Sequence, residues 1–288
     1  NENVGDIVSA DDVDSSFYDK YVYSTNEDGT ISMDGYLNKW DINTERNAIY
    51  IPSLYKGKVV TAIGRTLNKY SNTKKIYVSS TVNFIGDMFY NDDVVEDVYF
   101  RNYKSKTTFN YYKDSTKHHW PREVIVNDEG VLQELVGYED DTEIDLREYT
   151  NIVNIGSAFR GKTTWEKVYL PSTMVTFPSW LIYPLQGCNS TFYMSNNKSQ
   201  VTFESSWDYG FTGSIVWPKE VIVDENGVLK ELVGFDDTDE VLDLREYTNI
   251  INIGSVLGGK TYTDIYLPSS AVAFGDYALA HTTSTVHM

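Results

Sequence analysis

Side chains that could carry out catalytic chemistry are few and scattered in this sequence. It has four histidines and one cysteine, and it lacks the Gly-x-Ser-x-Gly, His-Glu-x-x-His and Walker-type motifs. His118 and His119 are adjacent, and neighbours on an extended chain point apart, so they make a poor chelate. We therefore expect no catalytic residues and no cofactor. The remaining enzyme hypothesis is a glycosidase, whose two carboxylates any β-rich scaffold can hold without a spacing signature.

The acidic runs at 139–143 and 236–240 are the candidates for metal binding. Carboxylate oxygens are the ligands that Ca²⁺ prefers. Neither run has the Asp-x-Asp-x-Asp-Gly order of a calcium loop, however. We interpret both runs as solvated acidic loops and predict no metal site. The sequence alone does not decide whether these loops bind Ca²⁺.

The composition excludes several classes of protein. With 41% hydrophobic and 23% charged residues among 288, the chain is of the globular type. Its formal net charge of −18 opposes phosphate backbones, so nucleic-acid binding is not expected. No apolar run approaches the ~18 residues that span a bilayer, so we predict no membrane insertion. Cys188 has no partner for an intrachain disulfide and is expected to be a buried, inert thiol.

Long internal repeats organise the chain. Residues 120–137, beginning Trp-Pro-Arg-Glu-Val-Ile-Val, return at 217–234 as Trp-Pro-Lys-Glu-Val-Ile-Val, and residues 145–157 return at 243–255. A more divergent copy comes first, because residues 98–109 align without gaps to 192–203. We therefore predict an N-terminal acidic segment (1–16) and three repeat modules at 17–119, 120–216 and a truncated 217–288.

A short strand word recurs within the modules, with an apolar residue on each side of a Tyr or Asp. The central residues of this word are 27, 22, 46, 24, 24, 50 and 23 residues apart, and each of the two long intervals contains an inserted hairpin. One short strand per repeat of about 22–27 residues is typical of leucine-rich repeats. We predict a β-rich leucine-rich-repeat solenoid with a right-handed coil, inserted β-hairpins and few short helices.

A second word follows most of the strands, and a hairpin lies near the start of each module. The second word ends in Ile-Gly, as at 60–64, 82–86, 152–156 and 250–254, and its Gly suits a sharp bend. The apolar pairs that follow it, such as Met88-Phe89 and Ala158-Phe159, are expected to fill the core. Hairpins with a Gly-closed turn are predicted at 21–33, 123–136 and 220–233.

These words, in this order, resemble the BspA-like bacterial leucine-rich repeat family. The closest stretch is Ile49-Tyr-Ile-Pro52 followed by Gly57-Lys-Val-Val-Thr-Ala-Ile-Gly64, and the resemblance covers about residues 20–280. The family's Ala-Phe-x-Gly-Cys ending is mostly degraded, with remnants at Ala158-Phe159 and Gly187-Cys188. The resemblance implies a secreted or surface-attached bacterial protein that binds host or neighbouring-cell components without catalysis.

Alternation along the strand word predicts one exposed face. In Ile49-Tyr50-Ile51 the two isoleucines are expected to enter the core and Tyr50 to face solvent. The same rule places a single ladder on this face, made of Tyr50, Tyr77, Tyr99, Asp145, Tyr169, Tyr193, Asp243 and Tyr266. Two residues further on, the same face is expected to carry Pro52, Ser79, Arg101, Arg147, Pro171, Ser195, Arg245 and Pro268.

The ladder has a functional and a structural interpretation. Solenoids commonly bind on their sheet face, and Tyr loses little entropy on ordering. Tyr also favours strands, and cross-strand aromatic pairs stabilise a sheet without any ligand. The hypothesis is a non-catalytic extracellular binding or adhesion module for a protein or glycan. The alternatives are a structural spacer that displays another domain and a carbohydrate-binding module.

Both ends of the chain give expectations of their own. The sequence opens at Asn1 followed by acidic residues, which suggests either a trimmed chain or a mature end, so that any export signal would have been removed. We therefore expect an extracellular or cell-surface location. The third module stops before its expected tail, so the natural polypeptide either continues past Met288 or ends its array there. Trp120 and Trp217 begin equivalent modules and are expected to pack over the seams between modules.

Overall fold

The computed structural model describes residues 15–36, 47–65, 72–86, 95–110, 116–179, 183–235 and 239–288. Helix in these ranges is confined to one turn at 15–18 and to short 3₁₀ turns that include η1 (Lys104–Lys106) and η3 (Lys198–Gln200). The chain divides into two compact units. Unit 1 comprises Asn1–Ile125 and Leu135–Glu139, and unit 2 comprises Val126–Glu134 and Asp140–Met288.

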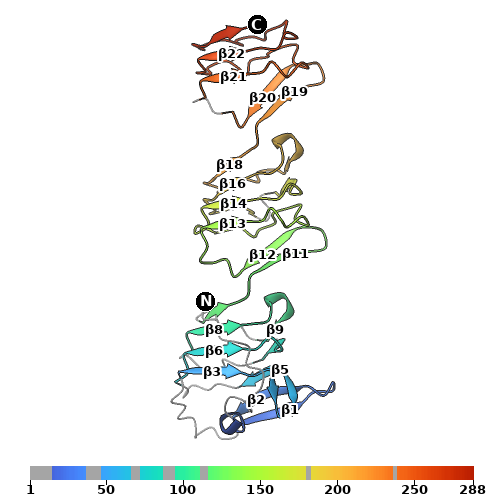
Figure 1. The fold of residues 1–288 in the computed structure, drawn as a ribbon, viewed down its shortest axis with the longest axis vertical. Coiled ribbons are helices and arrows are strands. Elements are labelled where there is room, and N and C mark those ends of the chain that lie inside the picture. Colours follow the sequence, from blue (N-terminus) through green and yellow to red (C-terminus); the bar gives the residue numbers. More distant parts are fainter. Residues whose placement is uncertain are drawn as a thin grey trace. The chain divides into compact units, whose positions relative to one another are not determined.

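Unit 1 is built from coils that each contribute a strand to two sheets. The parallel sheet has the order β10-β8-β6-β3, from β3 (Ala48–Ile51), β6 (Lys75–Val78), β8 (Asp97–Phe100) and β10 (Lys117–His119). The other sheet has the order β1-β2-β5-β7-β9, from β1 (Tyr21–Thr25), β2 (Ile31–Tyr36), β5 (Lys58–Arg65), β7 (Phe84–Ile85) and β9 (Thr108–Phe109), with β4 (Leu54–Tyr55) beside β5. Successive coils therefore stack strand on strand (Figure 1).

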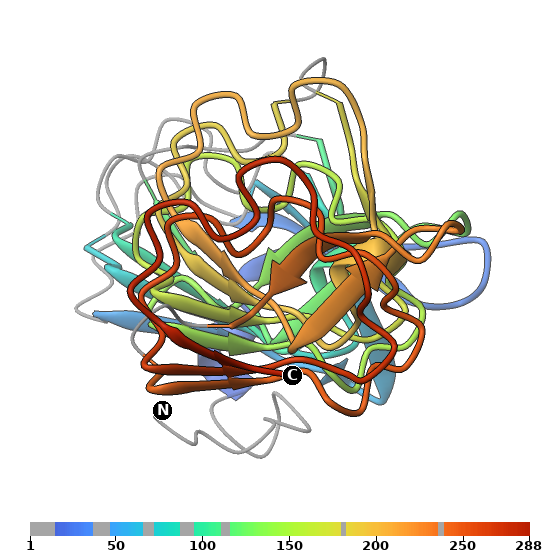
Figure 2. The same ribbon diagram turned by 90° about the horizontal axis from the view of Figure 1, so that it is seen from above.

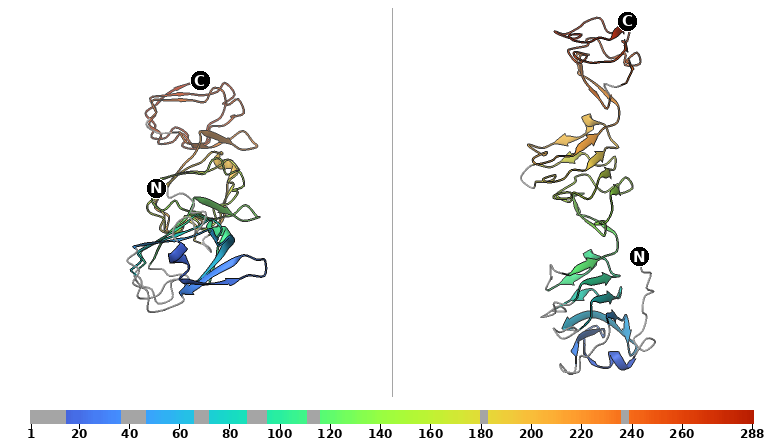
Figure 3. Two further views of the ribbon diagram at one scale, coloured as in Figure 1. Left: turned by 60° about the horizontal axis from the view of Figure 1, so that its bottom comes forward. Right: turned by 90° about the vertical axis from the view of Figure 1, so that its left-hand side faces the viewer.

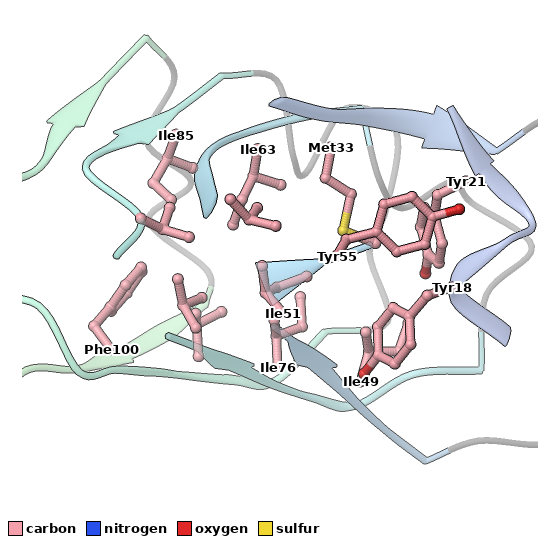
Figure 4. Packing of buried hydrophobic residues seen from close by; sticks show 14 of the residues in the cluster. Tyr18, Tyr21, Met33, Ile49, Ile51, Tyr55, Ile63, Ile76, Ile85 and Phe100 are labelled. Carbon is pink, nitrogen blue, oxygen red and sulfur yellow. The ribbon is translucent and has the colours of Figure 1, made fainter. Parts of the chain in front are cut away.

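The core of unit 1 lies between these two sheets. Strands β3, β6 and β8 alternate between half-buried and buried residues, as expected for strands with one covered face. The inward residues of the two sheets meet as facing rows, which Figure 4 shows for Ile85, Ile63 and Met33 against Phe100, Ile76 and Ile49. Tyr18 closes one end of this core, and its hydroxyl donates to the Tyr50 carbonyl at 2.6 Å.

Unit 2 repeats this design with shorter strands. Its parallel sheets have the orders β13-β14-β16-β18 and β21-β22-β23. Their strands are β13 (Glu143–Asp145), β14 (Lys167–Tyr169), β16 (Thr191–Tyr193), β18 (Ser214–Val216), β21 (Val241–Asp243), β22 (Asp264–Tyr266) and β23 (Thr285–His287). The second row of strands is reduced to β15 (Thr176–Phe177), β17 (Thr202–Phe203) and isolated bridges such as Asn154 to Thr176. Within each unit the short strands lie side by side (Figure 3).

Hairpins interrupt the coils at the three predicted places. They are β1 with β2, β11 (Glu123–Val126) with β12 (Leu132–Val136), and β19 (Glu220–Val223) with β20 (Leu229–Val233). The division between the units runs within the second hairpin. The side chain of Asn127 accepts hydrogen bonds from the amides of Glu129 and Val131, and Gly130 takes a φ of +77°. This local side-chain to backbone bonding is why Asn and Gly occupy the turn.

A glutamate ties each of the last two hairpins to the coil before it. The Glu123 carboxylate accepts from both the amide and the hydroxyl of Ser105, in the turn η1. Glu220 accepts in the same way from Ser199, in η3, and Lys198 adds an ion pair with Glu231 on β20 at 2.5 Å. In each case one glutamate carboxylate accepts two hydrogen bonds from a single serine, and these bonds fix the hairpin to a 3₁₀ turn.

The predicted β-solenoid fold is confirmed, with one strand of a parallel sheet per coil, a second short strand in many coils, inserted hairpins and little helix in the described residues. Viewed from above, the C-terminal coils in Figure 2 trace one loop over another. Each of the two long intervals contains its predicted hairpin and, in addition, one further strand of a parallel sheet. The strands β10 and β18 lie in them, so the coil period continues up to each hairpin. Phe159 is buried as expected, whereas Met88-Phe89 lie outside the described residues. The three-module division remains a prediction.

Candidate functional site

The first ring stack consists of Tyr50, Tyr77, Tyr99 and His119 on the parallel sheet of unit 1. These residues are paired in register across β3, β6, β8 and β10. Their ring centroids are 4.7, 4.8 and 4.3 Å apart in that order, and neighbouring planes are tilted by 7 to 13°. The rings therefore lie face to face along the sheet, at the spacing of its strands.

The second and third ring stacks lie on the two parallel sheets of unit 2. In the second stack, the Tyr169 and Tyr193 rings are 4.8 Å apart, and the Arg147 guanidinium lies 4.9 Å from the Tyr169 ring. In the third stack, the Tyr266 and His287 rings are 4.4 Å apart, and Arg245 lies 4.7 Å from the Tyr266 ring. A cation over an aromatic face is attracted by the ring quadrupole, so each arginine covers one end of its stack.

Each arginine is held in place by the aspartate two residues before it. Arg147 Nε and Nη2 donate to the two carboxylate oxygens of Asp145, at 2.9 and 2.6 Å. The matching bonds from Arg245 to Asp243 are 2.9 and 2.5 Å. The guanidinium beside it lowers the pKa of Asp145, and Arg245 lowers the pKa of Asp243 to about 2. Both pairs are exposed fork-to-fork contacts that orient the arginine rather than bury charge.

The two histidines of the stacks share a second arrangement. His119 Nε2 lies 2.7 Å from Asp97 Oδ1, and His287 Nε2 lies 2.7 Å from Asp264 Oδ1. Each aspartate comes two residues before the tyrosine on which the histidine stacks. A hydrogen bond at one ring nitrogen fixes the orientation of an imidazole, so the carboxylate holds it flat against the tyrosine.

The structure corrects two predictions about this face. The predicted residues form three separate stacks on three sheets, not one continuous ladder. Half of the eight residues expected two positions further on are also not exposed on the face, because Pro52, Ser79, Pro171 and Pro268 are buried. Alternation requires an extended backbone, and the strands end before these positions, where the chain turns into the coil.

The other members of that second row differ among themselves. Arg147 and Arg245 are exposed, Arg101 is half-buried, and the exposed Ser195 donates its hydroxyl to the Leu170 carbonyl at 2.6 Å. The structure therefore brings together Asp145, Arg147, Tyr169 and Tyr193 in one place and Asp243, Arg245 and Tyr266 in another. Tyr50, Tyr77 and Tyr99 lie together in unit 1, with Arg101 two residues beyond Tyr99.

His119 and His287 are stack members that the sequence pattern missed. They follow the preceding ladder tyrosines, Tyr99 and Tyr266, by 20 and 21 residues. Val216 follows Tyr193 by 23 residues and takes the corresponding register position on β18. The intervals to the two histidines are shorter than the repeat of about 22–27 residues, so the coil period alone indicates only Val216. The strand word was defined by a central Tyr or Asp, so positions that hold histidine or valine did not match it.

Other candidate positions serve structural roles. His118 packs against Phe100 and Phe109, and burial lowers its pKa to about 4, so the imidazole is neutral at physiological pH. Cys188 is buried, as predicted, with its sulfur 3.3 Å from the Ser190 hydroxyl. Among the described residues, no group of three or more His, Cys, Asp or Glu side chains is placed to hold a metal ion. Residues 236–238, which belong to one of the acidic runs, lie outside the described residues.

The two module-starting tryptophans pack onto the coil before them. Trp120 stacks on Phe100 at 3.8 Å and meets Phe109 edge-on at 5.6 Å. Trp217 meets Phe203 edge-on at 5.9 Å. Both indoles are half-buried and cover the last aromatic residues of the preceding coil.

Comparisons with known proteins give a sparse result. No protein-family model matches the chain, and no curated protein matches it. Among solved structures, it is similar to a leucine rich cell surface protein from Faecalibacterium prausnitzii A2-165, with 15% identity, a TM-score of 0.28, and coverage of 93% of this chain and 75% of the other. It is also similar to a leucine-rich repeat protein from Eubacterium ventriosum ATCC 27560, with 12% identity, a TM-score of 0.24, and coverage of 91% and 93%.

Likeness at this level does not establish a family or a function. The fold assignment rests on the stacked coils themselves, and membership of the BspA-like family stays a prediction. No helix within the described residues is long and apolar enough to cross a membrane.

Proposed function

We propose that this chain is a non-catalytic binding module of a bacterial surface or secreted protein. It contacts a protein or glycan of a host or neighbouring cell through the sheet faces that carry the ring stacks. The observation that carries this proposal is the set of half-exposed, regularly spaced rings on one face of each parallel sheet. Fold alone does not assign function, so the proposal rests on these faces.

Stacking decides which part of each ring can meet a partner. Tyr77 has Tyr50 against one face and Tyr99 against the other, so its edge is the part presented outward. Rings held in this way have already lost their rotamer freedom, which lowers the entropy cost of binding. A partner would therefore meet a rigid row of aromatic edges. Contacts at several stacks would add up, so weak individual contacts could give useful avidity.

The charge of the chain limits the partner. A net charge of −18 repels polyanions at long range. The arginines on the stacks do not reverse this, because Asp145 and Asp243 pair with Arg147 and Arg245. A neutral or basic partner surface fits the module best.

One observation favours a structural spacer as the second candidate. The rings cover one another, and arginines cover the end rings Tyr169 and Tyr266. Cross-strand aromatic pairs contribute about 0.2–1 kcal/mol each to a sheet, which is reason enough for a stack without a ligand. On this hypothesis, the stacks stiffen an array that displays another domain.

A binding screen at physiological salt distinguishes the two candidates. The chain would be tested against extracellular-matrix proteins and a glycan panel, with and without Ca²⁺. A saturable interaction that falls at least tenfold in the Tyr169→Ser, Tyr193→Ser double variant supports the binding module. No saturable interaction anywhere in the screen would favour the spacer.

Two controls keep the screen interpretable. Tyr209→Ser removes an exposed tyrosine of unit 2 that lies outside the three stacks, and it should leave binding unchanged. Circular dichroism and thermal unfolding of the double variant should show a folded chain. If the double variant stays folded and binds as tightly as the parent, the stacks are not the site.

A further inference from the structure

One core position is covered in two modules and exposed in the third. Ile85, Phe177 and Phe274 each come nine residues after a buried strand residue, namely Ile76, Val168 and Ile265. Ile85 and Phe177 are 0% exposed, whereas Phe274 is 41% exposed. The difference lies in what covers the position, because the strand word and the spacing are the same.

The covering element is of the same kind in both modules. Ile85 pairs in register with Phe109 on β9, and Phe177 pairs with Phe203 on β17. Both covering strands read Thr-Phe, and each follows a 3₁₀ turn, η1 or η3. The Phe203 ring lies 5.2 Å from that of Phe177 and nearly parallel to it, and Trp207 adds a second ring at 5.0 Å.

The backbone repeats the same relationship. The carbonyls of Val175 and Phe177 accept hydrogen bonds from the amides of Thr202 and Glu204, at 2.7 and 3.0 Å. Ala273 bridges to Asn252 just as Thr176 bridges to Asn154, so the second row of strands is started in the same way. The carbonyls of Val272 and Phe274 therefore occupy the positions of the two carbonyls that accept hydrogen bonds from the covering coil in module two.

Two other apolar side chains close to Phe274 in the sequence are exposed as well. Val272 is 75% exposed, against 37% for its counterpart Val175. Tyr277 is 83% exposed and holds a φ of +58°, in the left-handed region that a non-glycine residue seldom adopts. An apolar cluster of this kind on a soluble protein marks a site of contact.

We propose that the face formed by Val272, Phe274 and Tyr277 is a docking surface for one more coil of the same repeat, supplied in cis. The docking coil carries a 3₁₀ turn and then a Thr-Phe strand, so that its phenylalanine covers Phe274 as Phe203 covers Phe177. The proposal rests on the two covered counterparts, Ile85 and Phe177, whose covering strands come from the coil that follows in the chain. It is independent of the function proposed for the ring stacks.

A graft tests this directly. A copy of residues 195–216 is joined after Met288, which occupies the position of Met194, so the added segment brings its own Thr-Phe strand and its own Lys198. A docked coil should resist trypsin at the copied lysine at least tenfold longer than an unstructured tail, because native-state cleavage follows the open population. Intact mass identifies the cut, and thermal unfolding should move upward in the same chain.

Phe274→Ser is the deciding variant. In the ungrafted chain it should leave thermal unfolding nearly unchanged, because Phe274 is partly exposed there. In the grafted chain it should restore rapid cleavage. A graft that is cleaved like a free tail, with or without Phe274, overturns the proposal. Concentration-dependent dimers of the ungrafted chain that Phe274→Ser abolishes would also overturn it, since the occupant would then be a second copy.

Discussion

The ring stacks of the two units differ most at their first rung, meaning the position on the first strand of each parallel sheet. In unit 1 the first strand of the parallel sheet carries Tyr50, which stacks on Tyr77. In unit 2 the first strands carry Asp145 and Asp243, and the arginines two residues later cover Tyr169 and Tyr266. The guanidinium lies 4.9 or 4.7 Å from its tyrosine ring, close to the 4.7 Å between Tyr50 and Tyr77.

This difference shows what the position requires. A planar guanidinium stacks on an aromatic face much as another ring does, and the aspartate fixes its plane. The face of the sheet therefore accepts any flat group at strand spacing, whether phenol, imidazole or guanidinium. The buried row beneath varies in a different way, because the position before each stacked tyrosine is always apolar but holds isoleucine, valine or phenylalanine, as in Ile76, Val168 and Phe192.

The largest effect should come from the buried row beneath the stacks. Ile76→Ala in unit 1 and Ile265→Ala in unit 2 each leave a cavity at a fully buried site. Each should lower the free energy of unfolding by about 2–5 kcal/mol. Urea denaturation followed by hydrogen exchange would place the loss in the coils next to each mutation, as nearest-neighbour packing in a solenoid requires. A change below about 1 kcal/mol in either variant would contradict the assignment of these residues to the core.

The next effect separates a middle rung from an end rung. Tyr77 stacks on two tyrosines, whereas Tyr193 stacks on one, Tyr169. At about 0.2–1 kcal/mol for each cross-strand pair, Tyr77→Ser should cost up to twice as much as Tyr193→Ser. Tyr77→Phe keeps the stacked ring and serves as the matched control, measured in the same urea titration. Equal losses in the two serine variants would show that the stacks contribute little beyond strand propensity.

How much of this molecule could be predicted depends on whether local alternation or the coil period carries the information. Tyr50 between Ile49 and Ile51 was enough to place the ring outward, because a strand allows one arrangement of its two faces. Strand β10 was missed because His119, not tyrosine, stands in register with Tyr99, and because it follows Tyr99 by only 20 residues. Pro52 was misplaced because alternation does not report where an extended segment ends.

The contacts of the stacks were beyond the sequence pattern. Arg147 and Asp145 pair with each other, and the arginine lies over Tyr169, neither of which the strand word indicates. The two residues reach each other because β13 ends at Asp145 and Arg147 lies in the turn that follows. The residue that covers Phe177 could likewise not be identified from the neighbouring sequence, because it is Phe203 in the next coil.

The smallest effect concerns the Asp243–Arg245 ion pair, which acts as a clamp that holds the arginine over Tyr266 in the third stack. Arg245 donates to Asp243 and lowers its pKa from 3.8 to about 2. Because the folded pKa is depressed, the linked stability is fully present above about pH 4 and is lost as the pH falls towards 2. Arg245→Gln should raise the pKa of Asp243 towards 3.8, measured by NMR titration of the carboxyl carbon. Part of the depression should remain, because the amide of residue 245 still donates to the carboxylate. Arg160→Gln removes an arginine that lies over Tyr183, away from the clamp, and should leave the midpoint where it was. If Asp243 titrates near 3.8 in the unmodified chain, Arg245 does not pair with it and stacks on Tyr266 unaided. The resemblance between an arginine and an aromatic ring at this position would then depend on the stacking contact alone.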